Sequence, residues 1–139
     1  MHRRILLTLP ATLALAACLP AQPTSQPTGE TTPFAGPWRL IRLNGRRFDQ
    51  RATISFGTDG TLTGDGPCNQ WGGRQTAVQP AFRAEDVYST MVACTDDAAN
   101  TAEADFHAAL RTANQIAYTG RGMTLAGPNG VQMDFTRDG

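Results

Sequence analysis

Short stretches in which apolar and polar residues alternate recur along much of the chain, and this period of two is typical of half-buried β-strands. Dipeptides that tolerate positive φ angles separate them, as in tight hairpins. The predicted strands are 38–43, 52–56, a strand from Leu62, 116–118, 123–125 and 131–135. The predicted turns between them are Asn44-Gly45, Asp59-Gly60, 120–122 and Asn129-Gly130. Weaker candidates, 75–79 and 82–88, lie on either side of Pro80. This pattern predicts an antiparallel meander that closes or nearly closes.

One segment has the period of a helix instead. Its apolar residues form a single stripe: Ala102, Phe106, Ala109, Leu110 and Ala113. The spacing predicts a helix over about 98–113 that packs Phe106 and Leu110 against the sheet. Asn100 and Glu103 have the spacing of a capping box at its start. The predicted fold is therefore mainly β, a small antiparallel barrel with one α-helix.

The first 33 residues indicate a targeting segment and a tether. Two arginines precede an apolar stretch that is too short to span a membrane, which is the pattern of a secretory signal peptide over 1–17. The stretch ends in Leu15-Ala16-Ala17-Cys18, which resembles the bacterial lipobox, in which the cysteine is acylated and becomes the mature N-terminus. The alternative is an ordinary signal peptide that is cut near Leu19-Pro20-Ala21, so that Cys18 is lost.

The residues after Cys18 are rich in proline and poor in large apolar side chains, so they cannot form a core. We predict that 18–33 is a lipidated tether and that 34–139 is one folded domain. Leu19 follows the cysteine where aspartate would favour retention in the inner membrane, by resemblance to enterobacterial sorting rules. The predicted location is the outer membrane, with the domain facing the periplasm and the lipid anchor as its membrane contact.

Two cysteines, Cys68 and Cys94, remain in the folded segment. In an exported protein an even pair favours a disulfide, which would stabilise the fold by about 3.5 kcal/mol in the chain-entropy model. The alternative is a reactive thiol or a metal ligand. The chain has no Cys-x-x-Cys spacing, and His107 is the one histidine outside the signal segment. We therefore predict the disulfide and no metal site.

The charge composition excludes several functions. Lysine is absent, which removes Schiff-base and phosphate-loop chemistry. The formal net charge is zero, whereas a nucleic-acid-binding domain is visibly basic. The sequence therefore predicts no nucleic-acid partner and no cofactor.

No arrangement of side chains predicts catalysis. His107 is expected to face solvent on the helix, in an exposed row with Glu103 and Arg111. Ser55 and Ser89 have no accompanying histidine motif. We predict no catalytic residue and no enzymatic activity.

Charge is distributed unevenly along the domain. Residues 39–51 hold five arginines against one aspartate, and 84–110 hold six acidic residues without an arginine. The basic stretch could contact the phosphates of anionic lipid or lipopolysaccharide. The alternative is that it protects a sheet edge against pairing with another chain.

A series of motifs resembles a known family. In chain order they are Trp38-x-Leu40-x-x-Leu43-Asn44-Gly45, Phe56-x-x-Asp59-Gly60-x-Leu62-x-Gly64, Cys68-Asn69-x-Trp71-x-Gly73, Ser89-Thr90-Met91-Val92-Ala93-Cys94, Glu103-x-x-Phe106-x-x-Ala109-Leu110, Leu125, Gly130 and Phe135. This order, over about 34–137, resembles the META domain family of HslJ-like envelope lipoproteins. The resemblance implies a lipocalin-like barrel, a connection with heat-shock or antibiotic stress, and no established enzymatic activity. Pro67 departs from the family, which usually has glycine before Cys-Asn.

These observations together predict a non-enzymatic, lipid-anchored envelope protein that supports stress or antibiotic tolerance by binding an unknown protein or small ligand. The alternatives are a lysozyme-inhibitor type of protein and a pilot of outer-membrane secretion. We expect the binding surface in a rigid loop over 64–74, with Asn69, Gln70, Trp71 and Arg74 as its contact residues. For Trp71, the alternative is that it fills the end of the barrel.

Overall fold

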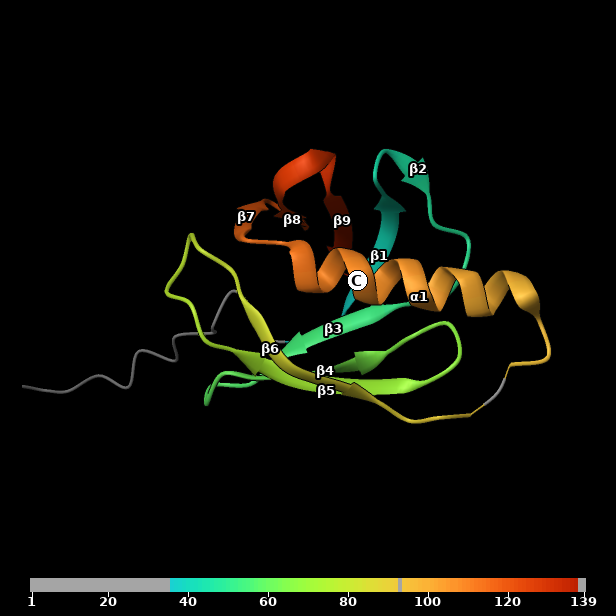
Figure 1. The fold of residues 1–139 in the computed structure, drawn as a ribbon. Coiled ribbons are helices and arrows are strands. Elements are labelled where there is room, and N and C mark those ends of the chain that lie inside the picture. Colours follow the sequence, from blue (N-terminus) through green and yellow to red (C-terminus); the bar gives the residue numbers. More distant parts are fainter. Residues whose placement is uncertain (1–35, 93, 138–139) are drawn as a thin grey trace, which may run out of the picture. The chain divides into compact units, whose positions relative to one another are not determined.

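The sheet of this domain has the antiparallel order that the alternating pattern predicts. The computed structural model describes residues 36–92 and 94–137. The predicted signal peptide, Cys18 and the tether therefore lie outside the described residues. The strands are β1 (Trp38–Leu43), β2 (Arg46–Arg47), β3 (Thr53–Phe56), β4 (Thr61–Asp65), β5 (Gln70–Gln75), β6 (Ala84–Ser89), β7 (Gln115–Thr119), β8 (Gly122–Ala126) and β9 (Gln132–Arg137). The helix α1 spans Asp97–Thr112, and a short 3-10 turn spans Pro128–Gly130 (Figure 1).

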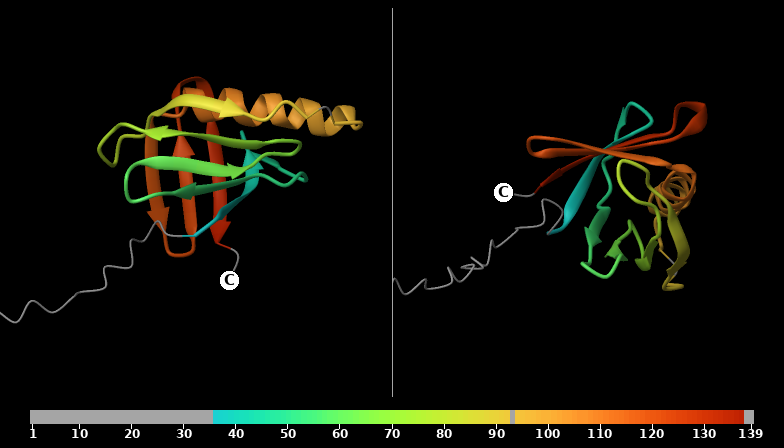
Figure 2. Two further views of the ribbon diagram at one scale, coloured as in Figure 1. Left: turned by 90° about the horizontal axis from the view of Figure 1, so that it is seen from below. Right: turned by 90° about the vertical axis from the view of Figure 1, so that its left-hand side faces the viewer.

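Every pairing between these strands is antiparallel, and the order is β6-β5-β4-β3-β1-β9-β8-β7, with β2 paired to β1. The two ends of the sheet approach each other beside β7, where the Phe82 N–H donates to Asn114 O and the Ile116 N–H to Pro80 O, each at 2.9 Å. The result is a curled sheet in which β3–β6 run across β7–β9 (Figure 2). The prediction of a mainly β, barrel-like fold is confirmed.

The hairpin turns lie where the dipeptides predicted them. Asn44 and Gly45 both have positive φ, 50° and 79°, and they connect β1 to β2. Asn129 and Gly130 also have positive φ before β9. Both residue types adopt this region at low cost, which explains why the turns occur at these positions.

The helix lies where its apolar stripe predicted it, but its cap differs from the prediction. Asp96 is the N-cap, and its carboxylate accepts the Ala98 N–H at 2.9 Å. The predicted capping box of Asn100 and Glu103 is therefore wrong. The reason is that both side chains have partners elsewhere: the Asn100 amide donates to Cys94 O at 3.1 Å.

The core lies between the two halves of the sheet and the helix. Phe106 and Leu110 are fully buried, as the helical stripe predicted. Other large core side chains come from strands and from the segment before β6: Trp38, Leu40, Ile54, Leu62, Trp71, Phe82, Met123, Leu125, Met133 and Phe135. No helix among the described residues is long and apolar enough to cross a membrane.

The predicted loop over 64–74 is wrong. Strand β4 continues to Asp65 and β5 begins at Gln70, so the connection is only residues 66–69. Three of the four glycines that suggested a loop lie inside strands, and of these Gly72 pairs with Thr63 on one side and with Tyr88 on the other. The weak strand predicted over 75–79 is also wrong beyond its first residue, because β5 ends at Gln75.

Candidate functional site

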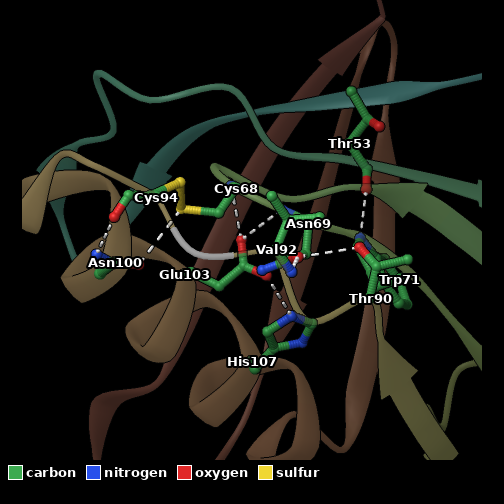
Figure 3. Close-up of polar contacts among 10 residues, drawn as sticks. All are labelled: Thr53, Cys68, Asn69, Trp71, Thr90, Val92, Cys94, Asn100, Glu103 and His107. Atoms are coloured by element: carbon green, nitrogen blue, oxygen red, sulfur yellow. Dashed lines mark hydrogen bonds and ion pairs between the residues drawn. A yellow bond between two sulfur atoms is a disulfide. The ribbon is translucent and has the colours of Figure 1, made fainter.

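The short turn over 66–69 is bound to the helix through one carboxylate (Figure 3). Glu103 Oε2 accepts the backbone N–H of Cys68 at 2.9 Å and that of Asn69 at 3.3 Å. The Glu103 side chain is only 12% exposed. Gly66 makes this approach possible, because a Cβ at that position would overlap Glu103 Oε2. A residue that sequence analysis placed in a helix cap thus fastens the β4–β5 turn to α1.

The disulfide ties the same turn to the segment before the helix. Cys68 and Cys94 are joined, with their Cα atoms 5.7 Å apart, as predicted. The disulfide and the Glu103 carboxylate both hold Cys68, the first through its side chain and the second through its backbone N–H. Together they hold residues 66–69 by both a covalent and a hydrogen-bonded link to the region of α1.

Asn69 is occupied by contacts within the protein. Its Oδ1 accepts the Thr90 hydroxyl at 3.0 Å and the Val92 N–H at 2.7 Å. These bonds hold the segment that follows β6 against the turn, while the Met91 side chain between them is 99% exposed. Asn69, predicted as a contact residue, therefore positions the segment that carries Met91.

His107 does not face solvent, and that prediction is wrong. The residue is 7% exposed, and its ring lies edge-on to Trp71 and Phe106, with centroids 6.2 Å and 5.3 Å away. Its Nε2 lies 3.4 Å from Glu103 Oε1, and its Nδ1 is buried without a hydrogen-bond partner. The prediction fails because the indole of Trp71 extends the buried face of α1 beyond its apolar stripe.

Burial sets the protonation of His107. Desolvation lowers the pKa of the imidazole below its ordinary value, and the charge and hydrogen bond of Glu103 oppose this effect without cancelling it. Within the described part of the chain, no group of three or more histidine, cysteine or acidic residues could hold a metal ion. Among the described residues, His107 packs against the rings of Trp71 and Phe106 and is in contact with the Glu103 carboxylate.

Trp71 belongs to the core. It is 3% exposed, its ring lies edge-on to Phe106 at 5.5 Å, and its indole N–H donates to Thr53 O at 3.1 Å. Gly64 faces this indole across the strand pair, and a Cβ there would overlap Thr53 O. Of the two interpretations of Trp71, the structure therefore supports packing.

The outward side chains of β3–β6 form a groove of about 500 Å³, which we call the outer groove. Its main lining residues are Arg51, Ser55, Thr63, Asp65, Gln70 and Tyr88. The lining residues on β4 and β5, such as Thr63 and Gln70, alternate with buried residues such as Leu62 and Trp71, so their side chains lie on the face opposite the core. The strand register places Ser55, Thr63, Gly72 and Tyr88 in one row across the sheet.

The outer groove includes two of the four predicted contact residues, Gln70 and the almost fully buried Trp71. Gln70 lines it next to Asp65, its partner across the strand pair. Arg74 is exposed on β5 but pairs with Thr61, beyond the lining residues. Sequence analysis missed Tyr88 and Thr63, although alternation with the buried residues of the same strands could have placed both on the outward face.

A second groove, of about 550 Å³, lies along β7 and β8, and we call it the β7 groove. It has no charged lining residue among the described residues; it includes Val78, Gln115 and Ala117. Four of the five arginines of the 39–51 stretch lie on the β1–β2 hairpin, where Arg47 forms an exposed ion pair of 2.7 Å with Asp49. The fifth, Arg51, lines the outer groove.

Comparison with solved structures shows the same fold. An NMR structure of a protein from Burkholderia xenovorans has a TM-score of 0.61 and 17% identity, and the match covers 86% of this chain and 99% of that one. A second NMR structure has a TM-score of 0.60 and 20% identity, covering 74% and 89%. A crystal structure of a DUF4847 family protein from Bacteroides vulgatus has a TM-score of 0.55 and 16% identity, covering 77% and 95%.

A search of curated proteins found no match. The family model of the META domain matches residues 31–139, which includes every strand and the helix described above. The matched range includes the turn over 66–69, which we call the latched turn, and the residues that hold it, Cys94 and Glu103. The chain therefore belongs to the META domain family, and this membership supports an envelope-associated role in general terms.

Proposed function

We propose that this protein is a lipid-anchored envelope protein that supports stress or antibiotic tolerance by binding a small ligand or partner in the outer groove, without catalysis. The single observation that carries the proposal is the outer groove itself, a concave surface of about 500 Å³ with several polar side chains and the exposed aromatic ring of Tyr88. Sites for small ligands have this size and this mixture of groups.

The frame around the outer groove favours binding. Gln70, which lines the groove, directly follows the turn that the disulfide and Glu103 hold in place. Thr90, which also lines it, is held by the hydrogen bond from its hydroxyl to Asn69. A surface that is already ordered loses less conformational entropy when a ligand binds. The latched turn would thus contribute to affinity without touching the ligand.

The lipobox-like ending at Cys18 and the proline-rich tether support the proposed anchor. A tether of about fifteen residues could extend roughly 45 Å in a polyproline conformation. This reach would keep the outer groove accessible in the periplasm while the acyl chains stay in the outer membrane.

The proposal is tested by filling the outer groove with a large side chain. Thr63→Trp adds an indole to the middle of the groove, at an exposed position of β4. Ala117→Trp is the matched control, because it adds the same ring to an exposed position in the β7 groove. Cells that lack the protein are complemented with each variant and challenged with heat or an antibiotic.

We expect Ala117→Trp to restore tolerance like the wild type and Thr63→Trp to fail, while both purified proteins keep a thermal midpoint close to that of the wild type. Full tolerance with a folded Thr63→Trp protein would contradict the proposal, because the groove would then be dispensable.

One feature favours the alternative of an enzyme inhibitor. Met91 is 99% exposed on a segment that Asn69 holds in place, and an exposed apolar side chain on a rigid support suits insertion into a partner protein. Met91→Glu separates the two proposals. It should leave tolerance unchanged if the outer groove is the working surface, and it should abolish tolerance if Met91 is inserted into a partner.

A further inference from the structure

The ring of Tyr88, the exposed aromatic residue of the outer groove, lies over Gly72 of the neighbouring strand. Tyr88 stands opposite Gly72 in the strand pair, and a Cβ on Gly72 would meet the Tyr88 hydroxyl at 2.5 Å and its Cζ at 2.6 Å. The ring therefore occupies the space that a side chain at position 72 would fill. Because the residue is nevertheless 67% exposed, one face of the ring is open to solvent. Gly72 and Tyr88 together make an aromatic platform on the floor of the groove.

Neutral polar groups surround this platform. The hydroxyls of Thr63 and Ser55 continue the row across β4 and β3, and the Gln70 amide and the Thr90 hydroxyl line the neighbouring part of the groove. Hydroxyls and amides can each donate and accept hydrogen bonds. The groove therefore offers both kinds of partner beside one apolar surface.

The charged groups of the groove neutralise each other. Arg51 and Asp65 are the only charged residues in its lining among the described residues, and Arg51 Nη2 lies 3.5 Å from Asp65 Oδ2. A phosphate or carboxylate ligand would meet a cation that already has an anionic partner. A purely apolar ligand would leave the surrounding hydroxyls and amide without hydrogen bonds, which is costly once they are desolvated.

We infer that the outer groove binds a neutral oligosaccharide, an inference that rests on the proposed function of the groove. A pyranose ring has C–H groups on one face and hydroxyls around its edge. The C–H face carries slight positive charge and stacks on the negative face of an aromatic ring. In this arrangement one sugar ring covers Tyr88, and its hydroxyls bond to Gln70, Thr63 and the Arg51–Asp65 pair.

The test is isothermal titration calorimetry of the mature protein with two neutral probes, N,N′,N″-triacetylchitotriose and maltotriose. Tyr88→Leu keeps an apolar cover over Gly72 but removes the aromatic face. Gln70→Ala removes the amide from the outer groove. Its matched control is Gln115→Ala, which removes the same group from an exposed strand position in the β7 groove.

We expect at least one probe to bind the wild type with a dissociation constant of about 1 mM or lower. Tyr88→Leu should weaken this binding about tenfold, which corresponds to the upper range of an aromatic stacking contribution. Gln70→Ala should also weaken it, and Gln115→Ala should bind like the wild type.

Two results would overturn the inference: neither probe binds, or Tyr88→Leu and Gln70→Ala bind as well as the wild type. Comparison with the groove-filling variant separates this inference from the proposed function. If Thr63→Trp abolishes tolerance but no saccharide binds, the groove serves another class of ligand and only the inference fails. If a saccharide binds through Tyr88 but Thr63→Trp retains tolerance, the saccharide site stands and the role in tolerance fails.

Discussion

Replacing Glu103 by alanine should destabilise the domain by about 3 kcal/mol. The substitution removes the acceptor of two backbone N–H groups, Cys68 at 2.9 Å and Asn69 at 3.3 Å. It also removes the carboxylate beside His107 Nε2. The two N–H groups belong to the latched turn and His107 lies on the helix beside Glu103, so the interactions that the substitution removes are concentrated at one place in the fold.

The magnitude follows from the number and quality of these bonds. A hydrogen bond to a charged group contributes about 1.5–3 kcal/mol, and the longer bond to Asn69 belongs at the weak end of that range. Because the Glu103 side chain is only 12% exposed, solvent screening reduces the effect little. The better helix propensity of alanine returns about 0.5 kcal/mol. For a domain of about 100 residues, a net loss near 3 kcal/mol lowers the thermal midpoint by about 12 °C.

Guanidinium unfolding of the oxidised protein measures the change, with tryptophan fluorescence as the probe. Both tryptophans, Trp38 and Trp71, are buried, so their emission reports unfolding. Glu103→Gln keeps one acceptor oxygen and should lose about half as much. The matched control is Glu85→Ala, which removes an exposed partner of Arg83 and should cost less than about 0.5 kcal/mol. If Glu103→Ala were as mild as Glu85→Ala, the carboxylate would not hold the turn, and the reasoning would be refuted.

The remaining predictions concern pH, the disulfide, the core and the anchor. Folding lowers the pKa of His107, so below about pH 6.5 the unfolded chain binds more protons than the folded one. The contribution of His107 to stability should therefore be complete above that pH and be lost on acidification. A His107→Gln variant with the same pH dependence of unfolding would contradict this. Reducing the Cys68–Cys94 disulfide should cost about 3.5 kcal/mol by denaturant titration, and oxidised protein should show no free thiol on labelling after unfolding. Trp71→Phe should lose about 1–2 kcal/mol because Thr53 O loses its donor, with unchanged stability as the contrary result. Mass spectrometry of the membrane-derived protein should find acylated Cys18 at its N-terminus, whereas an unmodified chain beginning at Gln22 would exclude lipidation.

The fold could be predicted from the sequence because its signals are local. Alternation marked the strands, positive-φ dipeptides such as Asn44-Gly45 marked the turns, and the stripe through Phe106 marked the helix. Each of these depends on residues that are neighbours along the chain. The disulfide was also predictable, because only two cysteines remain in the domain.

The candidate site was harder to predict because it depends on contacts between distant segments. Glu103 contacts a turn 34 and 35 residues away, and nothing in the helical period indicates a carboxylate that turns inward. His107 is buried because Trp71, from another strand, covers it. The glycines of β5 suggested a loop, but they leave room for side chains of the neighbouring strand, as Gly72 does for Tyr88. A glycine in a strand can mark a close approach as well as a turn.

The pairing of β1 with β9 has a consequence for how the domain folds. These are the first and the last of the strands described, and they lie side by side near the middle of the sheet. In the strand order, the half built on β3–β6 and the half built on β7–β9 are therefore joined through a pairing of nearly the greatest sequence separation among the described residues. Such contacts have a large loop-closure entropy and slow the folding of β-rich domains. Until β9 arrives, Trp38 and Leu40 have no complete partner surface, so a chain that lacks its last strand should collapse without reaching a single packed state and should be prone to aggregation.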